Sequence, residues 1–77
     1  SARRRAEEIR AAELGRARAR LAHLSPRELT AVESLTAQIV NKLLHAPTVR
    51  LKEAAAAPDG AVYAETVRHL FDLSDDT

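Results

Sequence analysis

Apolar side chains recur at helical spacing in four stretches of this chain, and prolines and a turn separate the later ones. The stretches are about 2–23, 26–45, 47–57 and 60–72. In the first of them the helical stripe is formed by Ala6, Leu14, Ala17 and Leu21, and Leu24 continues it. The pattern therefore predicts an all-α fold, a small bundle of about four helices.

The boundaries of the second helix are the best marked in the sequence. Ser25 is a favoured N-cap residue, Pro26 suits the first helical position, and Glu28 completes a capping box. At the other end Pro47 disfavours a helical conformation of the residue before it. We therefore expect this helix to cover 26–45 and a third helix to begin at Pro47.

The second helix carries an unusually wide apolar face, which covers about half of its circumference at 3.6 residues per turn. Two interpretations are open: a central helix of a monomeric bundle, or a helix that joins a second copy of the chain. Few other residues are available to cover this face, which favours the second interpretation. The predicted dimer interface consists of Val32, Leu35, Ile39, Val40, Leu43 and Leu44.

Length and composition fit this interpretation. The 77 residues suffice for one small domain, and the only aromatic residues are Tyr63 and Phe71, so the core must be aliphatic. Such a domain is marginally stable alone, and association would add burial. The net charge of +1 indicates no strong attraction to nucleic acid or to a membrane, and the absence of cysteine excludes disulfides and thiolate chemistry.

No membrane span or signal peptide is visible, so a cytoplasmic protein with no membrane contact is expected. The chain begins abruptly within a charged helix, which suggests that it was cut from a longer protein.

No constellation of residues predicts catalysis or metal binding. His23, His45 and His69 share no local ligand spacing, and Pro47 argues against His45 as a phosphoacceptor in a continuous helix. The carboxylate pairs Glu7-Glu8 and Asp75-Asp76 lie in a solvated helix and a polar tail, outside any apolar pocket, so acid–base catalysis by them is not expected. We expect no catalytic, cofactor-binding or metal-binding residue in this chain.

The first helix offers an alternative function as an RNA-contacting module, because a cluster of arginines could bind phosphates. Interleaved acids and the lack of nearby aromatic residues favour a solvated helix face instead. The arginines are Arg3, Arg4, Arg5, Arg10, Arg16, Arg18 and Arg20.

A long string of residues resembles the C-terminal dimerisation domain of glutamyl-tRNA reductase. It runs from Ile39 to Thr48 as I-V-N-K-L-L-H-A-P-T and is joined by Leu35-Thr36 and Leu51-Lys52. Weaker matches are Ala6 to Arg10 with Glu13-Leu14, Leu24-Ser25, and Leu70-Phe71. The family often has a second proline where this chain has Ala46.

The resemblance implies a non-catalytic part of an NADPH-dependent oxidoreductase that makes glutamate-1-semialdehyde from glutamyl-tRNA in tetrapyrrole (haem, porphyrin) biosynthesis. It implies that residues 1–23 end a connecting helix and that 24–77 form the helical homodimerisation domain. NADPH and most of the tRNA would be bound by other domains of the parent enzyme. Asn41 and Lys42 recur in the family pattern, and for them we expect a helix-surface or inter-helix hydrogen-bonding role.

Overall fold

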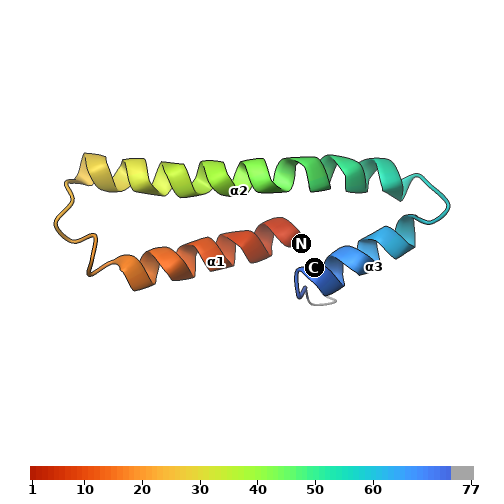
Figure 1. Cartoon of the computed structure of the whole chain (residues 1–77), viewed down its shortest axis with the longest axis horizontal. Helices are drawn as coiled ribbons and strands as arrows, with labels where there is room; N and C mark the ends of the chain where they lie inside the picture. The colour runs from red at the N-terminus through yellow and green to blue at the C-terminus, as the bar shows by residue number, and fades with distance from the viewer. Residues whose placement is uncertain (74–77) are drawn as a thin grey trace.

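The computed structural model describes residues 1–73, which form three helices and no strand. They are α1 (Ala2–Ala17), α2 (Pro26–Ala55) and α3 (Gly60–Leu70). Figure 1 shows α2 as one long rod, with α1 and α3 lying end to end along the same side of it. The predicted all-α fold is confirmed within these residues, and the predicted count of four helices is wrong. The predicted polar tail, with Asp75-Asp76, lies outside the described residues.

The miscount arises at Pro47, which lies inside α2 instead of beginning a new helix. A proline costs a helix one N–H donor and crowds the carbonyl four residues earlier, but here the helix continues through it to Ala55. Leu44 and Leu51 are seven residues apart on either side of it, so the inward-facing stripe continues without interruption. Packing of both halves of α2 on the other helices offsets the local cost.

The first helix is also shorter than predicted, because it ends at Ala17 and not at residue 23. The segment that follows contains turns, with Leu21 N–H bonded to the carbonyls of Ala17 and Arg18, and Leu24 N–H bonded to Leu21. No glycine or proline marks this change. The chain must reverse here to lay α1 against α2, and half-buried Leu21 and Leu24 hold the connection in place.

The predicted start of α2 is confirmed in detail. The Ser25 side chain accepts a hydrogen bond from the Glu28 N–H at 3.1 Å, and the Glu28 carboxylate accepts one from the Ser25 N–H at 2.9 Å. This is a complete capping box with Pro26 at the first helical position. It fixes where α2 begins and therefore which of its residues face α1.

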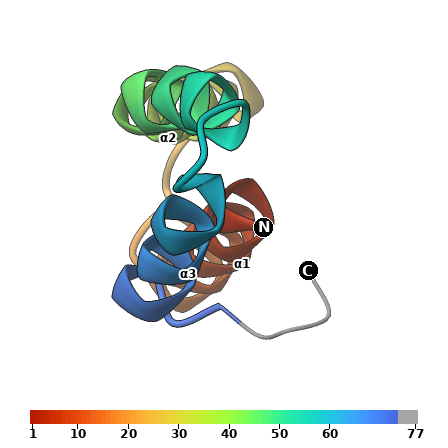
Figure 2. The same ribbon diagram turned by 90° about the vertical axis from the view of Figure 1, so that its right-hand side faces the viewer.

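The three helices form a single layer, and a single layer has almost no interior. The chain measures 53 × 20 × 15 Å, with a radius of gyration of 15.9 Å. A compact domain of this length would have a radius of about 11.5 Å. In the end-on view of Figure 2, α2 lies above α1 and α3, and no further helix of residues 1–73 covers either side of the layer. Among the described residues only Leu44 is buried.

The junction of α2 and α3 is close-packed at Gly60. A Cβ atom at this position would lie 2.6 Å from the carbonyl oxygen of Ala54 and 3.0 Å from the Cα of Ala55. The missing side chain therefore allows α3 to turn back directly along α2. At the far end of α3 the Leu73 N–H bonds to the Arg68 carbonyl at 2.8 Å, and this bond closes the helix.

Candidate interaction surface

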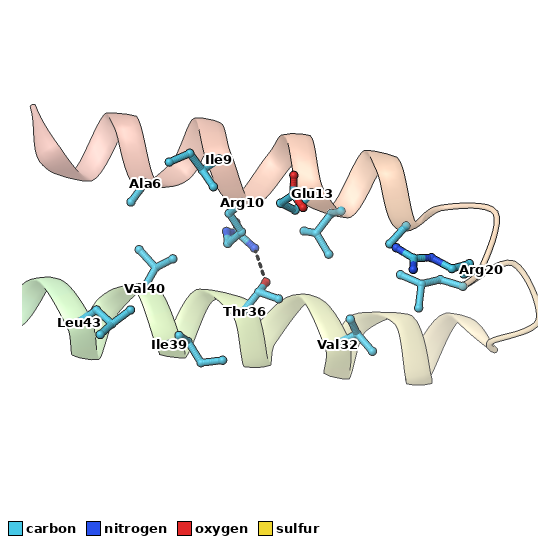
Figure 3. A pocket seen from close by; sticks show the side chains of 13 residues that line it. Ala6, Ile9, Arg10, Glu13, Arg20, Val32, Thr36, Ile39, Val40 and Leu43 are labelled. Carbon is cyan, nitrogen blue, oxygen red and sulfur yellow. Dashed lines mark hydrogen bonds between the residues drawn. The ribbon is translucent and has the colours of Figure 1, made fainter. Parts of the chain in front are cut away.

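An apolar groove runs between α1 and the first half of α2 (Figure 3). Most of its lining is aliphatic, and Arg10 crosses it to bond with Thr36. The apolar residues along it are Ala6, Ile9, Leu14, Ala17, Leu21, Val32, Ile39, Val40 and Leu43. Because the groove is open along one side of the layer, its apolar walls face water in the single chain.

The six residues of the predicted interface fall into two groups by exposure. Leu44 is 5 % exposed and lies within its own chain, and Val32 and Val40 are half-buried. Leu35, Ile39 and Leu43 are 57 %, 50 % and 70 % exposed. These last three are the most exposed large apolar residues of α2, and they lie four residues apart along one side of it.

Three further exposed residues extend this surface to the other helices. Ile9 of α1 is 49 % exposed and lines the same groove as Ile39 and Leu43. In α3, Tyr63 and Leu70 are 50 % and 72 % exposed. At about 100° per residue, with α3 antiparallel to α2, helical geometry places them on the same side of the layer.

We call Ile9, Leu35, Ile39, Leu43, Tyr63 and Leu70 the apolar side. The sequence-based interface contained only the α2 members of this set. The angular positions of Ile9, Tyr63 and Leu70 around their helices place them on this side of the layer. These positions can be used only when the pairing and direction of the three helices are known, and the sequence did not provide them.

Polar contacts fix α1 on α2. The Arg10 guanidinium donates to Thr36 Oγ1 at 3.1 Å, to the Glu33 carbonyl at 3.3 Å and to Glu7 at 3.0 Å. These bonds explain how a charged residue fits within the packed face of α1: the groups it meets there are acceptors.

Nearer the N-terminus Arg3 donates to Asn41 Oδ1 at 2.7 Å. This is an inter-helix hydrogen bond, one of the two roles expected of Asn41. Lys42 is exposed on the surface of α2, which fits the other expected role.

The three histidines that were considered as metal ligands lie on the surface of the chain. His23, His45 and His69 are all exposed, and within residues 1–73 no three His, Asp or Glu residues are grouped so as to hold a metal ion. The hydrogen bond from Arg16 to Glu13 raises the pKa of Arg16, but this guanidinium is charged at neutral pH in any case. None of the helices in the described part is long and apolar enough to cross a membrane.

Three of the seven arginines considered for RNA binding donate their side-chain hydrogen bonds to this chain: Arg3, Arg10 and Arg16. Their engagement leaves fewer guanidinium groups for phosphate. The RNA-contacting alternative stays an untested prediction.

Comparison with known proteins agrees with the resemblance seen in the sequence. Residues 1–73 match the family model described as glutamyl-tRNA(Glu) reductase, dimerisation domain. The chain belongs to this family. It is 54 % identical to the glutamyl-tRNA reductase of Frankia casuarinae over 61 residues, which are 79 % of this chain and 13 % of that protein.

Other relatives extend the match over nearly the whole chain. Identity to the glutamyl-tRNA reductase of Chloroflexus aurantiacus is 52 % over 71 residues, 92 % of this chain and 16 % of that enzyme. Identity to that of Streptomyces coelicolor is 43 % over 72 residues, 94 % of this chain and 12 % of that enzyme. The chain thus spans less than one-fifth of the length of these relatives. No solved structure gives a significant match.

Proposed function

We propose that this chain is the homodimerisation module of a glutamyl-tRNA reductase. One observation carries the proposal: residues 1–73 form a single layer of helices in which only Leu44 is buried, while Leu35, Ile39 and Leu43 expose half or more of their surface. Monomeric soluble proteins rarely leave such a contiguous apolar row in water. A second copy, packed against the apolar side, would supply the core that the single chain lacks.

The activity of the whole enzyme is part of the same proposal. The relatives are named glutamyl-tRNA reductase. We propose that the whole enzyme reduces the activated glutamyl ester to glutamate-1-semialdehyde with NADPH, at the start of tetrapyrrole synthesis, as the resemblance implies. This chain has no cysteine that could serve as a thiolate nucleophile. The chemistry and the NADPH site would therefore lie in other domains, and this module would hold two catalytic arms together by two-fold symmetry.

We further propose that α1 is the end of the helix that connects the arms to this module. The hydrogen bonds of Arg3 and Arg10 to α2 support this assignment, because they would transmit the orientation of α2 directly to the connecting helix. A cytoplasmic location and tRNA contacts made mainly by the other domains complete the proposal.

The proposal is tested by the mass of the 77-residue chain in solution. Sedimentation equilibrium at micromolar concentrations should give twice the chain mass of 8.4 kDa. A single monomeric species over the whole concentration range would refute it.

A charged substitution in the apolar side identifies the surface responsible. Leu43→Asp buries an unpaired carboxylate in each half of a symmetric interface, and it should weaken the dimer at least 100-fold, since every 1.4 kcal/mol counts tenfold. Ser34→Asp is the matched control, because Ser34 is exposed and lies about 140° from Ile39 around α2. Equal effects of the two substitutions would exclude the apolar side as the interface.

A further inference from the structure

Five residues on the outward face of α2 are placed symmetrically in sequence about Ile39, which is one of them. Leu35 and Leu43 lie four residues before and after it, and Glu28 and Arg50 lie eleven residues before and after it. At about 100° per residue all five lie within about 40° of the Ile39 direction. An apolar centre thus ends in an acid on one side and a base on the other.

We propose that two copies of the chain pack with their α2 helices antiparallel, about a two-fold axis that passes beside Ile39. The inference rests on the proposed function and gives the geometry of the same interface. Ile39 then meets Ile39 of the partner subunit, and Leu35 meets Leu43 of the partner subunit. Each copy contributes the same residues, as a two-fold interface requires.

The charges at the two ends of α2 favour this direction of pairing. In the antiparallel arrangement Glu28 lies at the same height as Arg50 of the partner subunit, about 16 Å from the axis along the helix. A parallel arrangement would place Glu28 opposite Glu28 and Arg50 opposite Arg50, and like charges facing each other cost free energy.

Both groups are available for this contact. Arg50 is exposed and takes part in none of the ion pairs formed within residues 1–73. The Glu28 carboxylate uses Oε1 for the capping box at the Ser25 N–H. Its second oxygen is not needed for the cap and can accept from a guanidinium.

The area that a stable dimer needs shows that α2 does not act alone. A standard interface buries about 800 Å² per partner. An upper limit for the area that Leu35, Ile39 and Leu43 can bury is that of three whole aromatic side chains, about 450–750 Å². The three aliphatic side chains are smaller than this and are partly buried already. The other helices must therefore contribute.

The proposed axis brings them into contact. It is perpendicular to α2 and lies between the layers of the two copies. The α1 and α3 helices of both copies therefore lie on the same side of the paired α2 helices, as α1 and α3 do in Figure 1. Since α1 packs on the first half of α2 and α3 on the second, each α1 faces α3 of the partner subunit (Figure 1). Tyr63 and Leu70 of α3 are thereby covered without any contact between the two α3 helices.

Disulfide cross-linking tests this register directly, because the chain has no cysteine of its own. Ile39→Cys should cross-link with itself under mild oxidation. Leu35→Cys alone and Leu43→Cys alone should not, because each would lie about 12 Å along the helix from its copy, beyond disulfide reach. An equimolar mixture of the two should cross-link into heterodimers.

The outcomes separate this inference from the proposed function. Cross-linking of Leu35→Cys with itself would show a parallel pairing and overturn the inference. A dimeric mass without cross-linking of Ile39→Cys or of the mixture would also overturn it, while leaving the proposed function intact. A monomeric mass of the unmodified chain would refute both.

Charge reversal provides an independent test that leaves the apolar residues unchanged. Arg50→Glu places two acids together at both ends of the dimer and should raise its dissociation constant about tenfold. In the double variant, Glu28→Gln removes the repulsion while keeping an amide oxygen for the capping box. Its dissociation constant should therefore be about threefold lower than that of Arg50→Glu alone. A dissociation constant that does not respond to Arg50→Glu, or a double variant no tighter than Arg50→Glu alone, would overturn the Glu28–Arg50 pairing.

Discussion

Leu44 should be the single most important side chain for the stability of this chain. It is 5 % exposed, and among the described residues no other side chain is buried. Truncating a buried leucine to alanine removes its transfer free energy and leaves a cavity, at a cost of about 2–5 kcal/mol. The core of a domain of this length rarely supplies more than about 3–5 kcal/mol, so Leu44→Ala removes a large fraction of it.

The neighbouring residue provides the control. Leu43 is 70 % exposed, so Leu43→Ala should cost the single chain less than about 1 kcal/mol while weakening its self-association. Urea unfolding followed by circular dichroism, repeated at several protein concentrations, distinguishes the two effects. The deficit of Leu44→Ala should persist at every concentration, whereas that of Leu43→Ala should grow as the dimer of the unmodified chain becomes populated. Equal unfolding midpoints for Leu44→Ala and the unmodified chain would contradict the burial argument.

The backbone offers further predictions that thermal unfolding can check. Gly60→Ala should destabilise the chain by about 1–3 kcal/mol because its Cβ would clash with the Ala54 carbonyl, whereas Gly15→Ala, with nothing within 4 Å, should stabilise α1 by about 1 kcal/mol. The same sign for both substitutions would refute the steric argument. Asp72 has a positive φ of 55°, which favours glycine, so Asp72→Gly should raise stability by about 1 kcal/mol; a lower melting temperature would contradict this.

The sequence predicted those features that depend on neighbouring residues. The capping box of Ser25 and Glu28 forms as expected, because both of its hydrogen bonds lie within one helical turn. The half-burial of Leu14 and Leu21 also follows from the stripe. These are local consequences of side-chain type and spacing.

Features that depend on how the helices pack could not be predicted in the same way. Nothing in the composition of residues 18–24 indicates that α1 ends at Ala17, since the reversal is imposed by packing against α2. The place of Arg10 in the packed face of α1 also depends on packing, because Thr36 and Glu33 of α2 accept its hydrogen bonds. The apolar members of α1 and α3 became part of the candidate surface only when the three helices were seen as one layer.

The continuity of α2 through Pro47 links the fold to the proposed dimer. A helix that ended at residue 45 would carry Glu28 but not Arg50, and its outward face would end in an acid without a matching base. It would also support α1 alone, because Leu51 and Ala55, which line the cavity at the α3 junction, lie beyond the proline. One uninterrupted helix therefore supports both α1 and α3. It also provides an outer face that can pack antiparallel against the same face of a second copy. If α2 were interrupted near Pro47, Arg50 would no longer continue the outward face, and the antiparallel pairing would be lost even with every apolar residue around Ile39 kept.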